Sequence, residues 1–450
     1  MEIVITSRET IKPSTPTPPH LRTFKLSLID QYQMRTVYMR AILFYSAQGD
    51  ANRFETTKMS NQLKESLSKT LTQFYQVCGK LEGNESVDCN DNGLEYYEAQ
   101  ANEPLQSVLT SPDALKLNQL LPSDVYNNGS GFDGLSGAQV TVFSCGGIAI
   151  GLSISHAVAD ALSLCTFIKA WAANTKNVVK SELKVSTGFT SIFPPRDVYP
   201  FAYASTDGKP LPRHPTKRFV FDGSKIAALK AKCSNKANFI PTRVEAVSAL
   251  ISKCMYNALK SSGSSIIIGV PVSLRKRMSP PFPQDSFGNL AVIEKLPPWV
   301  SNDDELELHS LVQRLREMIR KVDGDYCKKL LADNAELLAQ NHEDDRKIFM
   351  KQGTIFCSLS SWCGAPFYEA DFGWGVPTWV TPVYVNYKNL VRLMDTKNGD
   401  GIQAWVTLDV ESMARFEREP ELLEFSSVNP MVDDATCKNS SMIDQKMMFP

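Results

Sequence analysis

The sequence has little of what marks membrane, secreted or nucleic-acid-binding proteins. Its 450 residues carry a formal net charge of −1, which provides no basic excess for nucleic acid or an anionic membrane surface. No run approaches the roughly 18 uninterrupted apolar residues of a membrane span. The opening residues, MEIVITSRETIKPSTPTPPHL, lack the cationic start and long apolar run of a signal peptide. We therefore expect a cytoplasmic protein that binds neither nucleic acid nor a membrane.

Metal-binding and nucleotide-binding patterns are also missing. The ten cysteines form no C-x-x-C pair, and Cys357 and Cys363 have no histidine at zinc-finger spacing. This pattern predicts free thiols in a reducing compartment and no metal site. No G-x-G-x-x-G follows a strand-like run, and Gly373-Trp374-Gly375 lacks the third glycine. Walker-type, H-E-x-x-H and G-x-S-x-G patterns are absent, which argues against the usual kinases, zinc proteases and serine hydrolases.

Length and composition are those of a globular protein with two domains. Hydrophobic residues make up 43% of the chain and charged residues 22%, and 450 residues exceed one typical core. The segment 193–215 contains six prolines and no apolar period, so we predict a linker there. The predicted domains are then 1–192 and 216–426. Residues 427–450 are polar and aperiodic, which predicts a disordered tail.

Strand-like and helix-like runs are interspersed without strict alternation. Residues 138–156 predict a hairpin with Gly146-Gly147 at its turn, and Asp91-Asn92-Gly93 predicts a second one. Leucines spaced four apart after Met59 predict an amphipathic helix, as does the apolar period of 243–259. Because several strands are joined by hairpins, we predict an α/β fold with mixed sheets instead of a doubly wound parallel sheet.

One of only five histidines, His156, lies where a strand-like run gives way to a helix-like run, and Asp160 follows four residues later. Such a histidine is often a core residue with both nitrogens bonded. An i, i+4 metal pair is a second interpretation, although no third ligand is near in sequence. The third is general-base catalysis, because neutral histidine can take a proton from a bound hydroxyl. Asp160 could then orient the ring, or hold the loop through a cation elsewhere.

The segment Ser155 to Asp160 resembles the H-x-x-x-D motif of the BAHD acyltransferases, the acyl-CoA-dependent transferase family of plants. A second and more specific motif, Asp371-Phe372-Gly373-Trp374-Gly375, follows far downstream, as in that family. Residues 272–290 resemble the family's stretch that ends in an F-G-N turn, and 360–375 also fit. The resemblance runs from about residue 11 to about residue 424. It is strongest to the branch of alkaloid and terpenoid O-acetyltransferases.

This resemblance implies a fold and a mechanism. The family has two similar-sized domains with mixed sheets flanked by helices, as in chloramphenicol acetyltransferase, and a channel between them. His156 would deprotonate the acceptor hydroxyl without an acyl-enzyme, and this base would contribute about 10²–10⁴-fold to the rate. Asp160 would turn away from the channel and pair with an arginine, for which Arg275 is the matching candidate. Asp371 would be a supporting residue with a chiefly structural role.

The resemblance also implies supporting candidates: Ser361 and Trp362 for the channel or the oxyanion, and Lys276, Arg277, Gly288 and Asn289 for coenzyme A. Two exposed cations in a loop are more often simply solvated, and Trp362 could equally belong to the core. The sequence departs from the family pattern at two positions. Val376 stands where a lysine is common, and Gly364 stands where this branch often has arginine. Each departure removes a cation near a motif.

The implied activity is acyl transfer from acyl-CoA, most similar to acetyl-CoA-dependent acetylation of an alkaloid or terpenoid hydroxyl. Acyl-CoA would be a co-substrate, with no permanently bound cofactor, and the protein would be a monomer. The alternatives are an aromatic or longer acyl-CoA, an amine acceptor, or a non-catalytic relative that binds a metabolite. A carrier-protein-dependent condensation domain usually has paired histidines and a glycine after the aspartate. Ser155 and Ala161 occupy those positions in this chain.

Overall fold

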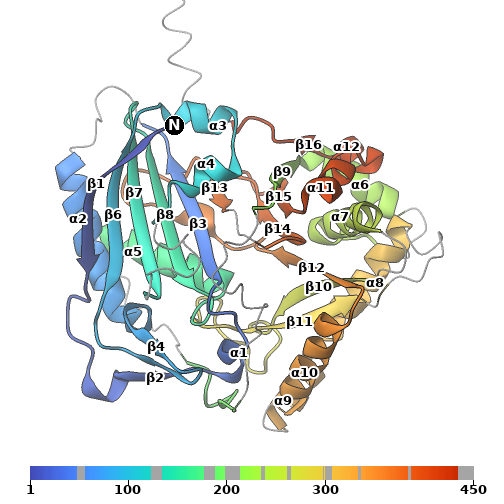
Figure 1. The fold of residues 1–450 in the computed structure, drawn as a ribbon, viewed down its shortest axis with the longest axis horizontal. Coiled ribbons are helices and arrows are strands. Elements are labelled where there is room, and N and C mark those ends of the chain that lie inside the picture. Colours follow the sequence, from blue (N-terminus) through green and yellow to red (C-terminus); the bar gives the residue numbers. More distant parts are fainter. Residues whose placement is uncertain are drawn as a thin grey trace, which may run out of the picture.

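Two large β-sheets, each flanked by helices, form the body of the protein (Figure 1). Each sheet contains both parallel and antiparallel strand pairs, so the predicted α/β class with mixed sheets is confirmed. The structure, a computed structural model, describes residues 1–47, 56–122, 134–176, 188–197, 213–234, 239–260, 265–296, 298, 307–332, 336–383 and 387–433.

The first sheet has six strands, in the order β1-β6-β7-β8-β3-β13. Their bounds are β1 (Ile3–Ile11), β6 (Leu94–Ala101), β7 (Ser136–Phe143), β8 (Ile148–Ser155), β3 (Tyr38–Tyr45) and β13 (Trp379–Pro382). Only β6 and β7 pair in parallel among these neighbours. The helices α2 (Thr56–Gln73) and α5 (Ala161–Thr175) pack against it. Leu63, Leu67 and Leu71 are fully buried, because their spacing of four places them on one face of α2.

One of the two predicted hairpins is present and the other is not. β7 and β8 pair antiparallel, with Gly146 at the turn in a left-handed conformation (φ 86°). The Asp91-Asn92-Gly93 turn instead leads out of a small three-stranded sheet into β6 of the first sheet. Asp91 accepts hydrogen bonds from the backbone N–H and hydroxyl of Thr17 at 3.0 and 2.6 Å. This contact with a distant segment fixes the turn, and the local turn signal could not reveal it.

The second sheet has seven strands, in the order β11-β10-β12-β14-β15-β9-β16. Their bounds are β11 (Ala291–Leu296), β10 (Ser265–Ser273), β12 (Thr354–Ser361), β14 (Leu390–Asp395), β15 (Ile402–Thr407), β9 (Thr216–Phe221) and β16 (Ser427–Val428). Its core is shared with α6 (Gly223–Ser234), α7 (Arg243–Leu259), α8 (Leu308–Arg320), α11 (Val410–Phe416) and α12 (Pro420–Phe425). The predicted helix over 243–259 is confirmed as α7.

The remaining elements are short or lie at the edges of the two sheets. The small sheet consists of β2 (Thr23–Lys25), β5 (Ser86–Asp88) and β4 (Lys80–Glu82). The other helices are α1 (Leu28–Gln31), α3 (Leu105–Thr110), α4 (Ala114–Asn118), α9 (Gly324–Ala332) and α10 (Glu336–Met350), with 3₁₀ turns at Pro19–Leu21, Tyr75–Cys78 and Phe367–Glu369. Within the described ranges, none of the helices combines the length and apolarity needed to cross a membrane.

Two strand pairings do not follow the predicted division of the chain into domains and a tail. β13, from the predicted domain 216–426, pairs with β3 of the first sheet. The prediction of a disordered tail from residue 427 is wrong for Ser427 and Val428. These two residues form β16, which pairs with β9. Two residues are too short to show a strand period. Residues 198–212 of the predicted linker and 434–450 of the tail lie outside the described residues, and the domain division itself stays a prediction.

Candidate active site

His156 lies in the loop between β8 and α5. β8 is buried at every position, because its side chains meet apolar clusters on both faces of the sheet. The strand ends at Ser155, and the backbone N–H of His156 then donates to the Val37 carbonyl at 2.8 Å. Four residues later Asp160 caps α5, with its Oδ1 accepting the Ser163 N–H at 2.9 Å. The loop is therefore held at both ends.

Asp160 forms an ion pair with Arg275, the partner implied by the family resemblance. The guanidinium donates from Nη1 to Asp160 Oδ2 at 2.7 Å and from Nη2 to Oδ1 at 3.0 Å, a two-pronged geometry. Arg275 is fully buried. Burial alone would raise the pKa of Asp160, but the charge and hydrogen bonds of Arg275 outweigh it and the pKa is lowered. The carboxylate is therefore ionised and serves the fold of the loop.

Arg275 also fixes the loop 286–290. Its Nη2 donates to the carbonyls of Ser286 and Gly288 at 3.0 and 3.1 Å. The Gly288 N–H donates to the Ser163 hydroxyl at 3.0 Å. Gly288 has a φ of +133°, and an added Cβ would lie 2.8 Å from the ring of Phe189. Only glycine suits both the conformation and the close contact.

Asn289 connects this loop to His156. Its Nδ2 donates to the His156 carbonyl and to Asp30 Oδ1, both at 2.8 Å, and its backbone N–H donates to the same Asp30 oxygen at 3.1 Å. Sequence reasoning missed Asp30. A signal was present, because Ser27 and Asp30 form a capping box at the start of α1. We call Asp30, Asp160, Ser163, Arg275, Ser286, Gly288 and Asn289 the anchoring network.

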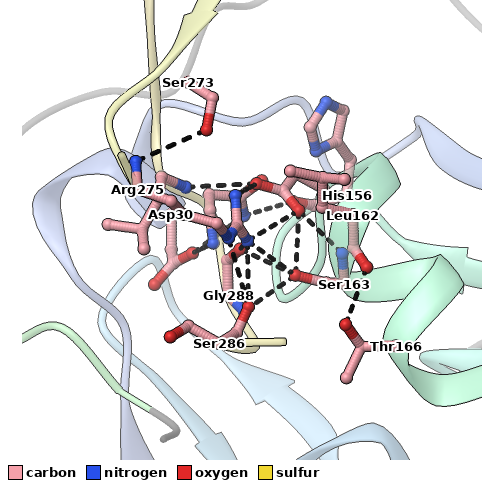
Figure 2. Close-up of polar contacts among 12 residues, drawn as sticks. Asp30, His156, Leu162, Ser163, Thr166, Ser273, Arg275, Ser286 and Gly288 are labelled. Carbon is pink, nitrogen blue, oxygen red and sulfur yellow. Dashed lines mark hydrogen bonds and ion pairs between the residues drawn. The ribbon is translucent and has the colours of Figure 1, made fainter. Parts of the chain in front are cut away.

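Figure 2 shows the imidazole of His156 pointing away from the anchoring network, which holds only the backbone of that residue. Within the described ranges, Nδ1 is buried and has no hydrogen-bond partner. Burial lowers the pKa of His156, the charge of Arg392 acts in the same direction, and Asp160 and Asn289 oppose them. The ring is therefore neutral near pH 7, as a general base requires.

The Asp371 motif forms a separate structure. Asp371 Oδ1 accepts the backbone N–H groups of Gly373 and Gly375 at 2.8 and 2.9 Å, and Oδ2 pairs with Lys176 at 2.7 Å. Phe372 is fully buried and meets the ring of Tyr45 edge-on, with centroids 6.0 Å apart. Within the described residues, the hydrogen bonds and the ion pair of Asp371 thus join its own loop to Lys176, the residue that follows α5. The carboxylate closes a turn and attaches it to the C-terminal end of α5.

The other predicted site residues occupy varied surroundings. Gly288 and Asn289, predicted for coenzyme A, are buried, and the backbone of Gly288 and the side-chain amide N–H groups of Asn289 bind partners inside the protein. Lys276 is exposed, whereas half-buried Arg277 donates to the Ser273 carbonyl at 2.8 Å. Ser361 is exposed at the end of β12. The structure therefore brings His156, Asp160, Arg275, Gly288 and Asn289 together, and leaves Asp371 apart.

The structure also shows the surroundings of Trp362 and of the two positions, Gly364 and Val376, that depart from the family pattern. Trp362 is buried and stacks on Phe367, with centroids 5.9 Å apart. Gly364 has a φ of +82° and donates its N–H to Asp395 at 2.7 Å. A side chain would be strained in that conformation, so the missing arginine accompanies a turn that favours glycine. Val376 is 51% exposed.

Known proteins match nearly the whole chain. A family model described as "Transferase family" matches residues 1–423. A limonoid 1-O-acetyltransferase of Citrus sinensis is 36% identical over 447 residues, covering 95% of this chain and 99% of that protein. A 17,18-epoxy-17-hydroxycur-19-ene N-malonyltransferase of Strychnos nux-vomica is 37% identical over 432 residues, covering 95% of this chain and 91% of that protein.

A solved structure agrees with these sequence matches. The crystal structure of vinorine synthase superposes with a TM-score of 0.81 at 33% identity, covering 96% of this chain and 100% of that chain. The matched regions contain both the His156 and the Asp371 motifs and nearly all of both sheets. The chain therefore belongs to the BAHD acyltransferases, the plant transferase family that its motifs resemble.

Proposed function

We propose that the protein transfers a short acyl group from acyl-CoA to a hydroxyl of a plant terpenoid or alkaloid, with His156 as the general base. The observation that carries this proposal is the state of His156. Its backbone is fixed by the anchoring network, its ring points away from that network, and its pKa is lowered. A histidine serving only the core would have its ring nitrogens bonded inside the protein.

The proposed reaction is a direct transfer. The neutral imidazole takes the proton of the acceptor hydroxyl, and the oxygen attacks the carbonyl carbon of the thioester. The resulting tetrahedral oxyanion collapses, the C–S bond breaks, and the imidazolium returns the proton to the leaving thiolate. His156 ends unchanged, so no acyl-enzyme is required. We keep exposed Ser361 as the proposed hydrogen-bond donor to the oxyanion, and exposed Lys276 as a proposed contact of coenzyme A phosphate.

Asn289 has a positioning role in this proposal. Both hydrogens of its amide are already donated, one to Asp30 and one to the His156 carbonyl. Its Oδ1 is buried without a hydrogen-bond partner within the described residues, as is Nδ1 of His156, and the Asn289 side chain is one of the groups that raise the pKa of His156. In the proposed mechanism Oδ1 accepts a hydrogen bond from Nδ1 of His156, so that Nδ1 carries the proton. Nε2 would then keep its lone pair for the substrate.

The donor and acceptor are proposed from the relatives. The limonoid relative is named for acetyl transfer to oxygen and the Strychnos relative for malonyl transfer to nitrogen. Both names support a short acyl group, and acetyl is the group that the sequence resemblance implied. A hydroxyl acceptor follows the first name and the family branch. An amine acceptor is the second candidate, favoured by the second name.

The test is release of free thiol from acyl-CoA by the purified protein, supplied with a panel of terpenoid and alkaloid alcohols and amines. His156→Ala should lower kcat by about 10²–10⁴-fold. The matched control is His309→Ala on α8, whose side chain lies outside the anchoring network and contacts Ser310. This control should keep wild-type activity.

Three results would decide the matter. Thiol release that needs both an acceptor and His156 supports the transferase and identifies the acceptor class. Release that survives His156→Ala contradicts the general-base role. Tight metabolite binding without any release from short, aromatic or long acyl-CoA favours a non-catalytic binding protein.

A further inference from the structure

Arg392 is a buried cation between the two sheets. It lies on β14, where its register partners are Ser360 of β12 and Trp405 of β15. Its neighbours Val391 and Leu393 pack into the core of the second sheet. Side chains alternate along a strand, so Arg392 lies on the opposite face. Met394, two residues on, belongs to the core of the first sheet, which places Arg392 on the face that meets that sheet.

No carboxylate neutralises this charge within the part of the chain that the structure describes. Arg392 is 6% exposed. Its Nη1 donates to the Val383 carbonyl at 2.8 Å, and its guanidinium lies 5.6 Å from the centre of the Trp362 ring. Burial lowers the pKa of Arg392 to about 9, and the charge of Arg40 acts in the same direction. The group is still a cation at neutral pH, and a buried cation without an anion is costly.

The charge of Arg392 also affects His156, the proposed general base. It is one of the two influences that lower the pKa of His156. Arg40, also buried, lies on β3 opposite Ser153 of β8, three residues before His156. Val383 follows β13, whose Pro382 pairs with Ala41 next to Arg40. The strands that carry the two arginines and His156 therefore converge where the first sheet meets the second.

We propose that Arg392, assisted by Arg40, binds a carboxylate at the end of the acyl group, so that the donor is a dicarboxylic acyl-CoA such as malonyl-CoA. This inference rests on the proposed acyl transfer at His156. The reacting carbonyl must lie beside the imidazole, and a malonyl group then carries its carboxylate only two carbons farther. A guanidinium matches a carboxylate with two parallel hydrogen bonds. An acetyl group would present a methyl and leave the buried charge unpaired.

The carboxylate is a spectator in the chemistry. The bond that forms joins the acceptor oxygen or nitrogen to the malonyl carbonyl carbon, and the bond that breaks is the thioester C–S bond. The acceptor proton passes through His156 to the thiolate. The terminal carboxylate is ionised before and after the reaction. Arg392 therefore affects which acyl-CoA is preferred as donor, and takes no part in making or breaking bonds. A site built to hydrogen-bond one polar group rejects the analogue that lacks it, because its own polar group is then left unpaired.

Arg218 offers a matched control. It is also a buried arginine on a strand of the second sheet, it lies 5.3 Å from the Trp379 ring centre, and it donates to a backbone carbonyl, that of Pro430. Burial lowers its pKa to about 10. It does not contribute to the pKa of His156. Arg392→Met and Arg218→Met thus remove comparable groups, and of the two arginines only Arg392 is among the charges that lower the pKa of His156.

The experiment compares malonyl-CoA with acetyl-CoA as donors for wild type, Arg392→Met, Arg392→Lys and Arg218→Met, using acceptors without a carboxylate. Wild type should prefer malonyl-CoA. Arg392→Met should lower kcat/KM for malonyl-CoA by about ten- to a hundredfold, the effect of one charge-assisted hydrogen bond, and should lower that for acetyl-CoA much less, so that the preference for malonyl-CoA is lost. Arg392→Lys should lie between, and Arg218→Met should leave the donor preference unchanged.

Calorimetric binding to the His156→Ala protein separates this inference from the proposed function, because it needs no turnover. Tighter binding of malonyl-CoA than acetyl-CoA, abolished by Arg392→Met, supports the inference even if no acceptor is found. Equal binding of the two, or a wild-type preference for acetyl-CoA that Arg392→Met does not change, overturns it while acyl transfer stands. The same four proteins are then assayed with acceptors that carry a carboxylate. If Arg392→Met lowers activity only with those acceptors, Arg392 binds the acceptor and the inference is overturned.

Discussion

His156 is positioned through its backbone, and this leaves its ring available to a substrate. The N–H of the residue is held by Val37 and its carbonyl by Asn289. Charged groups act on the ring from several elements: Asp160 from the start of α5 raises its pKa, whereas burial and Arg392 of β14 lower it. The balance favours the neutral form at the pH of the cell.

The pH dependence of the reaction should reflect this balance. A lowered histidine pKa keeps the base deprotonated to lower pH, so kcat/KM should rise with pH through an inflection below the ordinary value of 6.5. Initial rates between about pH 5 and 8 would measure it, with circular dichroism at each pH to exclude unfolding. An inflection above 6.5 would mean that a nearby anion, and not burial, governs the imidazole.

The Asp160–Arg275 pair should matter for stability more than for chemistry. Arg275→Met would leave the Asp160 carboxylate without its cation and should lower the free energy of unfolding by about 3–5 kcal/mol. The double variant Asp160→Asn with Arg275→Met should lose less than the sum of the single changes, because neither partner is then left charged. Urea unfolding of the four proteins measures this coupling, and strict additivity would contradict it.

That stability should depend on pH in a defined direction. The folded-state pKa of Asp160 is lowered, so the pair contributes fully above the ordinary value of 3.8 and is lost as the pH falls through the lowered value.

At the scale of elements, the loop 286–290 carries Asn289 to His156, and its path depends on Gly288. The N–H of this glycine binds Ser163 of α5 while its carbonyl accepts from Arg275. The loop thereby connects β10 and β11 of the second sheet to the first turn of α5 beside the first sheet. A shift of the loop would move the side chain that contacts the His156 carbonyl.

Gly288→Ala should therefore reduce both stability and activity. Its Cβ would lie 2.8 Å from Phe189 in a left-handed backbone, at a cost of about 1–3 kcal/mol from the backbone alone. Gly364→Ala is the control, since its φ is also positive but nothing lies within 4 Å of an added Cβ. Thermal unfolding and kcat of both variants test this. If Gly288→Ala and Gly364→Ala lost the same amount of thermal stability and kcat, backbone strain would explain the effect and the contact with Phe189 would not.

At the scale of the whole molecule, the first sheet is completed by a strand from the other half of the chain. β13 pairs with β3, and Trp379 stacks on Phe44 with ring centroids 5.1 Å apart. Without β13, β3 would become an exposed edge that carries Ile42 and Phe44, both fully buried in the intact protein. Exposed apolar edge strands promote aggregation.

Residues 1–215 expressed alone should consequently be insoluble or unfold without cooperativity. Co-expression with residues 216–450, which supply β13, should restore soluble material. The soluble yield and the thermal melt followed by circular dichroism are the measurements. A soluble 1–215 fragment with a sharp melt would show that the first half folds independently of β13.

The sequence alone determined the features that depend on local pattern. Leu63, Leu67 and Leu71 predicted α2 because residues four apart share one helix face. Hairpin β7–β8 followed from alternation around Gly146-Gly147. Motif resemblance singled out His156 and proposed Arg275 for Asp160, because residue types at motif spacing are readable without coordinates. The predicted Asp91–Gly93 hairpin failed, because a turn signal does not say which strands it joins.

Only the tertiary structure decided which distant residues meet. Asp30 and Asn289 are 259 residues apart, and Asn289 and His156 are 133 apart, yet together they hold the base. β13 belongs to the first sheet although it follows most of the second along the chain. The sequence around Arg392 resembles that of any buried strand. Only the folded structure shows that, among the described residues, this arginine is buried against a backbone carbonyl and has no carboxylate beside it. Such contacts depend on how the two sheets meet, and local sequence carries no record of that.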